Sequence, residues 1–192
     1  NHLRHIQPNC AIHHDTPPEK PQDVRITSRN ETNPMSTFDA DSNVLHHVKS
    51  LPKSVSPMGL LDIIVAHFNC PVGTIHRMDD LTGLLHLVEK RGIPDAILPA
   101  IERIPLGKGM AGLAAQRREP VTVCNLQTDQ SGQAKPAAKL TGMEGSIAVP
   151  MLVDGRLIGV LGIAMPTAHQ FTESETTLLL QLATELGKRM ID

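Results

Sequence analysis

The sequence predicts an α+β fold in which the first and last helices of the folded part pack together on one face of an antiparallel sheet. Three observations predict it. Apolar residues recur at helical spacing near both ends of the folded part, two pairs of strand-like segments are each joined by a short turn, and a segment punctuated by glycine and proline separates the pairs. This order places the irregular middle on the other face of the sheet, where it would cover a pocket.

The first half of the folded part follows from local patterns. A helix begins at Pro57 and stops before Pro71, where its apolar face ends. Two strands joined by a hairpin loop come next, and the middle holds two short helices, the first of them disturbed by Pro99. The predicted ranges are 74–78 and 84–88 for the strands, 95–103 and 110–118 for the short helices, 121–124 for a further strand, and 125–143 for a polar loop with weak helix over 134–140.

The second hairpin and the last helix carry the firmest local signals. Strands over 146–153 and 156–164 flank Asp154-Gly155, a pair that tolerates the positive φ angles of a two-residue hairpin turn. Thr172 and Glu175 form a capping box at the start of the last helix, whose apolar stripe runs to Met190.

The chain divides into three regions by composition. Residues 1–42 read as a disordered leader or N-terminal extension, with Met35 as an alternative translation start, because this region is rich in proline and histidine and has little to bury. Residues 43–57 form a linker with a short helical turn over 43–48, and residues 58–192 form the folded domain. The leader also contains nitrogen and sulfur ligands, which we interpret as adventitious and not as a metal site. These are His2, His5, Cys10, His13 and His14.

Composition excludes several classes of partner. The net charge is −2 and aromatic residues make up 2% of the chain, with no Trp or Tyr, so a basic field and base-stacking platforms for nucleic acid are both missing. No apolar run approaches the roughly 20 residues of a membrane span. The three widely spaced cysteines signal neither a disulfide framework nor a zinc site, which favours the cytoplasm.

Five blocks of the sequence are informative together: PVGTIHRMDD, LLHLVEKRG, IPLGKGMAGLAAQRREPVTV, GSIAVPMLVDGRLIGVLGIA and FTESETTLLLQLA. Taken in order, they resemble the GAF domain, a small-molecule-sensing module of signalling proteins. The resemblance covers residues 58–190 and implies a sheet of five or six strands, a pocket covered by the middle segment, and a helix bundle that often mediates homodimerisation. It names no cofactor. The cyclic-nucleotide and bilin subclasses do not fit, because their characteristic residues have no counterpart here.

One enzyme class shares this fold, the free methionine-(R)-sulfoxide reductases, which use cysteine thiols. Their GxGxCG segment aligns with residues 107–112, which puts Ala111 at the position of a thiol, and another of their cysteines aligns with Ile101. Without these thiols the sulfoxide chemistry lacks its nucleophile. The resemblance therefore favours a protein that is not an enzyme.

The candidate ligand-binding residues lie in three places. The start of the second middle helix exposes backbone N–H groups at Gly109, Met110 and Ala111 that would hold a carboxylate or phosphate. If the first hairpin is symmetric about its loop, His76 lies opposite His86 with Cβ atoms about 5 Å apart. Such a pair would share a metal, bind an anion, sense pH, or serve only structure, and a register change of one residue would separate the two rings.

The third place is the end of the strand over 121–124. Cys124 and Asn125 complete the candidate set there, although a small thiol also suits a core position.

The leading functional hypothesis is a non-enzymatic GAF sensor. Its ligand, an unidentified small molecule, would bias the packing of the terminal helices at a homodimer interface. The chain shows no output module, so the signal would pass to a separate output protein, unless the chain is a fragment of a longer one. Two alternatives stay open: an orphan interaction or dimerisation domain without a ligand, and thiol- or metal-dependent catalysis through Cys124 or the two histidines.

Overall fold

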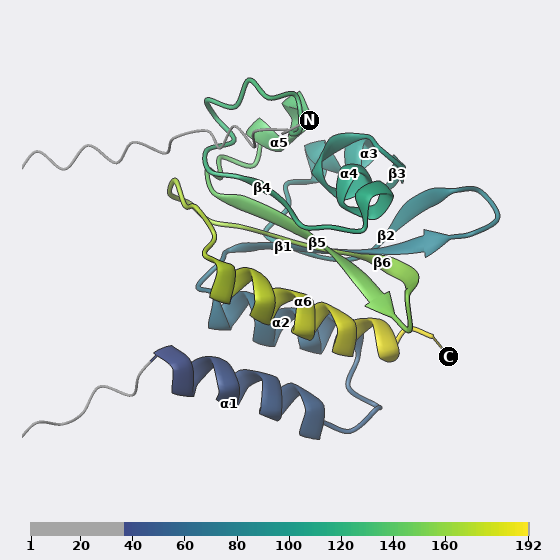
Figure 1. Cartoon of the computed structure of the whole chain (residues 1–192). Helices are drawn as coiled ribbons and strands as arrows, with labels where there is room; N and C mark the ends of the chain where they lie inside the picture. The colour runs from purple at the N-terminus through teal and green to yellow at the C-terminus, as the bar shows by residue number, and fades with distance from the viewer. Residues whose placement is uncertain (1–36, 192) are drawn as a thin grey trace, which may run out of the picture.

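The structure is a computed structural model that describes residues 37–191. It is an α+β fold, as predicted, with one antiparallel sheet of six strands in the order β3-β2-β1-β6-β5-β4. Helices α2 and α6 lie on one face of the sheet, and the segment that contains α3, α4 and α5 lies on the other (Figure 1). Most of the predicted leader, with its histidine and cysteine ligands, lies outside the described residues.

The elements follow the predicted order except at residues 103–105, which form a strand that was not predicted; a helix was expected over 95–103. The helices are α1 (Thr37–Ser50), α2 (Pro57–His67), the 3-10 turn η1 (Asp95–Ile97), α3 (Leu98–Ile101), α4 (Gly109–Arg117), α5 (Pro136–Lys139) and α6 (Glu173–Lys188). The strands are β1 (Val72–Asp79), β2 (Leu84–Arg91), β3 (Arg103–Pro105), β4 (Val121–Val123), β5 (Ser146–Val153) and β6 (Arg156–Ala164).

Helix α1 is longer than the sequence predicted. It spans Thr37–Ser50, whereas only a turn over 43–48 was expected and residues up to 42 were assigned to the leader. Its apolar side chains pack toward α2 and α6: Val48 is buried in the main core, and Val44 and Leu45 pack against it. The helix therefore gains most of its stability from tertiary packing, which a local pattern does not reveal.

In the first hairpin, the pairing of the two strands is shifted by one residue from the predicted register. Asp79 pairs with Leu84 and Arg77 with His86, and the same register sets His76 opposite Leu87 before a bulge between Ile75 and His76 shifts the pairing. Asp79 shifts the register because its carboxylate closes the turn, accepting hydrogen bonds from the Leu81 N–H (2.9 Å) and the Thr82 hydroxyl (2.6 Å). As a result, His76 and His86 lie on opposite faces of the sheet, and the predicted pair does not form.

The second hairpin and the start of α6 confirm the sequence prediction. Asp154 (φ 49°) and Gly155 (φ 75°) both take positive φ in the two-residue turn between β5 and β6. At the start of α6, the Thr172 Oγ1 accepts from the Glu175 N–H at 3.2 Å, and the Glu175 carboxylate accepts from the Thr172 N–H at 2.7 Å. The capping box thus fixes where the last helix begins.

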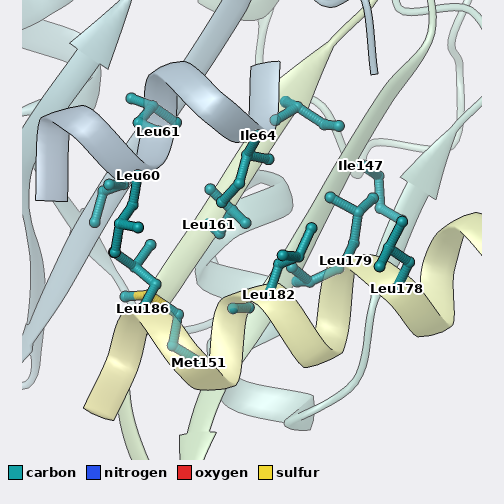
Figure 2. Close-up of a cluster of buried hydrophobic side chains, with 14 of the residues drawn as sticks. Leu60, Leu61, Ile64, Ile147, Met151, Leu161, Leu178, Leu179, Leu182 and Leu186 are labelled. Atoms are coloured by element: carbon teal, nitrogen blue, oxygen red, sulfur yellow. The ribbon is translucent and has the colours of Figure 1, made fainter. Parts of the chain in front are cut away.

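The main core lies between the sheet and helices α2 and α6 (Figure 2). Side chains from α2 and α6 meet those of β5 and β6, and nearly all of them are fully buried. The labelled members are Leu60, Leu61, Ile64, Ile147, Met151, Leu161, Leu178, Leu179, Leu182 and Leu186. This packing holds the sheet rigid, so the opposite face is a firm floor for a binding site.

A second, smaller core fixes α4 on that opposite face. Ala114 and Ala115 of α4 pack against Leu85, Ala148 and Val160. Gly112 makes the close approach possible, because a Cβ at this position would lie 2.3 Å from the Pro105 carbonyl oxygen. The start of α4 is therefore held close to the sheet.

Candidate functional site

A cavity of about 150 Å³ lies between the sheet and the segment that covers it. Its floor comes from β1, β5 and β6, and its cover comes from α3, the start of α4 and α5. The lining is mostly aliphatic. A dry apolar cavity of this volume holds a benzene-sized molecule, so the site fits one small compact ligand body.

The start of α4 supplies hydrogen-bond donors to this cavity. Gly109, Met110 and Ala111 all line it; that they bind a ligand stays a prediction. The first hydrogen bond in this turn runs from the Gly112 N–H to the Lys108 carbonyl (3.2 Å), and no side chain caps the helix. The three preceding N–H groups have no carbonyl one turn earlier to bond, so they are available to an anion.

Two lysines make the cavity electropositive. Lys108 precedes α4, Lys135 precedes α5, and both residues belong to the lining at its exposed rim. Among the described lining residues there is no Asp or Glu. Two ammonium groups and a helix N-terminus of positive partial charge favour a negatively charged group on the ligand.

His76 is the buried polar side chain of the floor. It is 2% exposed, and it lines the cavity together with Val72 and Thr74, its neighbours on the same face of β1. Its Nε2 lies 2.9 Å from the Ile101 carbonyl oxygen, whereas its Nδ1 has no hydrogen-bond partner among residues 37–191. Burial lowers the pKa of His76 below its usual value, and the hydrogen bond to Ile101 offsets part of this effect. The ring is therefore neutral at pH 7.

The other three predicted residues are not in the lining. His86 faces the helix side of the sheet, where its Nε2 lies 3.6 Å from the Asp79 carboxylate. Asn125 serves the local loop, because its amide donates to Glu144 (3.2 Å) and accepts from the Gln127 N–H (2.9 Å). Cys124 is half-buried beside it.

His76 and His86 lie on opposite faces of the sheet, so the two rings do not form the shared metal site that was considered for the predicted pair. Within the described part of the chain, no three His, Cys, Asp or Glu side chains gather into a group that would hold a metal ion.

The structure also adds lining residues that the sequence reasoning did not single out. Thr74 and Ser146 lie on strands that form the floor, and period-two alternation from His76 would have found Thr74. Lys135 and Thr141 come from the polar loop over 125–143, where no local pattern marks them. These residues reach the cavity because the folded chain carries the loop over the sheet, which the sequence of the loop itself does not indicate.

Comparison with known proteins assigns the family. The sequence model of the GAF domain matches residues 59–188. The chain belongs to the GAF domain family. It is 32% identical to protein YtsP of Bacillus subtilis over 93 residues, a match that covers 48% of this chain and 55% of that protein.

Solved GAF-fold structures resemble the molecule closely in shape. The GAF domain of a phosphoenolpyruvate-protein phosphotransferase from Coxiella burnetii superposes with a TM-score of 0.66 at 20% identity, covering 82% of this chain and 94% of that one. Free methionine-R-sulfoxide reductase from Neisseria meningitidis, solved with its substrate, gives a TM-score of 0.64 at 23% identity, covering 80% and 87%. At these identities the likeness shows the fold alone.

No helix within residues 37–191 is both long enough and apolar enough to cross a membrane.

Proposed function

We propose that this GAF domain binds a small organic anion in the cavity and transmits its occupancy to a partner through the helices on the far side of the sheet. The observation that carries the proposal is the combination of an aliphatic cavity with the free N–H groups at the start of α4. Apolar walls provide affinity, and a few convergent polar groups fix the orientation of a ligand. Lys108 and Lys135 support an anionic group, a carboxylate or a phosphate.

Strands β5 and β6 provide the physical link between the cavity and the helices. Ala148 of β5 lines the cavity and packs with α4, while the adjacent Ile147 belongs to the main core with α6. A ligand that displaces β5 by a fraction of an ångström therefore alters the packing of α6 as well, because closely packed interiors transmit strain. A homodimer formed through the helices, or a separate output protein bound to them, would respond to this change in the packing of α6.

Cysteine-dependent sulfoxide reduction is less well supported. Ile101 and Ala111, the positions that the resemblance assigns to thiols, both line the cavity. No cysteine is among the described lining residues, so a sulfoxide bound there would face no nucleophile from them. A binding role needs no such group.

Native mass spectrometry of the protein purified from its own cells tests the proposal. We expect a small adduct under gentle conditions that is lost on denaturation. Ala111→Leu fills the cavity while keeping the backbone N–H, so it should reduce the adduct several-fold. Ala66→Leu, the same change at an exposed position of α2, is the matched control and should keep it. A clean protein mass, with no change in Tm when a small-molecule extract of the cells is added, would contradict the proposal.

A further inference from the structure

We propose that the Thr74 hydroxyl in the floor of the cavity selects ligands with an oxygen on their body, so the occupant is a small hydroxy- or oxo-carboxylate. This inference rests on the proposed function and adds a second polar contact to it. The first is the contact with the anionic group of the ligand.

Strand β1 directs the Thr74 side chain to the cavity. Its two neighbours face the helices: Ile75 belongs to the main core, and a Cβ at Gly73 would lie 2.6 Å from the Val65 Cγ1 in α2. Side chains alternate between the two faces of a strand, so Thr74 faces the other way. It lines the cavity together with Gly162, its pairing partner on β6.

The position of Gly162 locates the hydroxyl. Paired residues of neighbouring strands share one face of the sheet, so a Cβ at Gly162 would stand on the cavity side. That Cβ would lie 2.9 Å from the Thr74 Oγ1. The hydroxyl oxygen of Thr74 therefore lies on the cavity side of the sheet, over a position that carries no side chain.

The Thr74 hydroxyl is accessible and has no partner in the protein. Thr74 is half-buried, and its Oγ1 makes no hydrogen bond within residues 37–191. In the same part of the chain, the fully buried side-chain polar atoms without a partner belong to His76 and His86, so the Thr74 oxygen retains accessible surface. Because Thr74 lies on the cavity face of a central strand, that surface opens to the cavity.

The other neutral polar side chains of the described lining are already engaged. The Ser146 hydroxyl donates to a backbone carbonyl at 3.2 Å, and the Thr141 hydroxyl donates to another at 2.7 Å and accepts from a backbone N–H at 3.1 Å. The His76 Nε2 is bonded to the Ile101 oxygen, and its Nδ1 is closed off by burial. Thr74 is therefore the neutral side chain that is left to hydrogen-bond a ligand.

An unpartnered hydroxyl in an aliphatic cavity penalises a hydrocarbon ligand. A ligand body that covers the Thr74 oxygen without offering a polar atom excludes water from it and leaves the hydroxyl unpaired, which costs free energy. A hydroxyl both donates and accepts, so a ligand hydroxyl or carbonyl oxygen restores the hydrogen bond. Sites that hydrogen-bond a ligand group discriminate more strongly than sites that select by apolar shape alone.

The charge and the volume of the cavity narrow the ligand further. An ammonium group would also pair with the hydroxyl, but the described lining contains two lysines and no carboxylate to balance a third cation. A benzene-sized cavity holds a body of about six heavy atoms. The oxygen of the ligand therefore stands on the first or the second carbon from its carboxylate.

Two matched pairs of acids separate the oxygen from the shape. In each pair a hydroxyl replaces a methyl group: 2-hydroxy-3-methylbutanoate against 2,3-dimethylbutanoate, and 3-hydroxy-3-methylbutanoate against 3,3-dimethylbutanoate. All four acids are titrated calorimetrically into the full chain. In at least one pair, the hydroxy acid should bind about tenfold tighter than its methyl counterpart.

Variants of Thr74 assign the preference to this hydroxyl. Thr74→Val keeps the shape and removes the oxygen, so the preference should disappear, whereas Thr74→Ser keeps the hydroxyl and should keep the preference. Thr122→Val, the same change at an exposed position of β4, is the matched control and should behave as the wild type. Because the hydroxyl has no partner in the protein, Thr74→Val without ligand should unfold at a Tm no lower than that of the wild type.

The contrary results separate this inference from the proposed function. Equal affinity within both pairs in the wild type would overturn the role of Thr74 and leave anion binding standing, since the methyl counterparts carry the carboxylate alone. A preference that survives in Thr74→Val would overturn that role as well. Failure of all four acids to bind at millimolar concentration would overturn both proposals together.

Discussion

At the scale of single residues, the buried imidazole of His76 should make stability depend on pH. Its pKa is lowered in the folded state, mainly by burial, while the unfolded chain titrates near 6.5. Below pH 6.5 the unfolded state therefore binds a proton that the folded state does not, and stability falls as the pH decreases; above pH 6.5 the two states hold equal charge at this residue. The loss amounts to as much as about 1.4 kcal/mol per pH unit.

Urea denaturation at pH 7.5 and 5.5 measures this effect. We expect the wild-type protein to lose more stability between the two values than His76→Phe does, by about 1 kcal/mol. His46 is an exposed residue of α1 and provides the matched control, because His46→Phe should leave the pH dependence as it is in the wild type. An identical loss in His76→Phe and the wild type would show that the ring is protonated in the folded state.

A second prediction at this scale concerns Cys70. Burial, with a smaller contribution from the charge of Glu175, raises the pKa of its thiol to about 12. Since only the thiolate reacts, Cys70 should resist iodoacetamide at pH 8 in the folded protein and react within minutes in urea. Peptide mapping by mass spectrometry gives the extent of labelling at this residue alone. Rapid labelling of Cys70 without urea would mean that α2 and β1 separate readily.

At the scale of elements, Arg189 joins the C-terminal ends of α6 and α1. Its guanidinium donates to the carbonyl oxygens of Val48 (2.6 Å), Leu51 (3.1 Å) and Pro52 (2.8 Å). Unpaired carbonyls at a helix end are well served by a cation. At its other end, α1 is held by the contact between Asp41 and His67, at 2.9 Å.

Replacement of Arg189 should loosen α1 and leave the sheet intact. In Arg189→Met, which keeps the apolar part of the side chain, we expect the amides of α1 to exchange with deuterium at least fivefold faster. The amides of β5 and β6 should be unchanged. Lys188→Met is the control, since Lys188 forms an exposed pair with Glu185 of the same helix. Equal exchange in α1 for both variants would show that apolar packing alone holds the helix.

The elements also show where sequence reasoning succeeds and where it stops. The turn at Asp154-Gly155 and the capping box at Thr172 were predictable because residues a few positions apart determine them. The predicted register of the first hairpin was wrong by one residue, because the register depends on how the Asp79 carboxylate closes the turn. Because of this shift in register, His76 lies on the face of the sheet that forms the cavity floor, and His86 lies on the other face.

The residues of the candidate site also divide into those that a local pattern predicts and those that it does not. Gly109, Met110 and Ala111 were found because a helix start is a local signal, and all three line the cavity. Lys135 reaches the cavity from a loop with no regular pattern, and the free nitrogen of His76 follows from a contact with Ile101, 25 positions along the chain. Contacts between distant segments decide these features, so a local pattern does not contain them.

At the scale of the whole molecule, α1 covers the helices through which a dimer is expected to form. It packs on α2 and α6 as an outer layer on that side of the sheet (Figure 1). Among residues 40–191, the large apolar side chains that are exposed lie outside the faces of α2 and α6: Leu81, Val88, Leu106, Leu140 and Ile191. A dimer built on α2 and α6 would therefore have to displace α1 first.

If the proposed dimer forms through α2 and α6, its stability depends on how firmly α1 is held. Arg189→Met weakens the attachment of α1, so displacing α1 costs less free energy when the dimer forms. The dissociation constant of the dimer should therefore fall by about tenfold. Sedimentation equilibrium of the whole chain, compared with Lys188→Met, measures the change. An unchanged dissociation constant would place the interface away from α1, and two monomeric proteins at high concentration would contradict dimerisation itself.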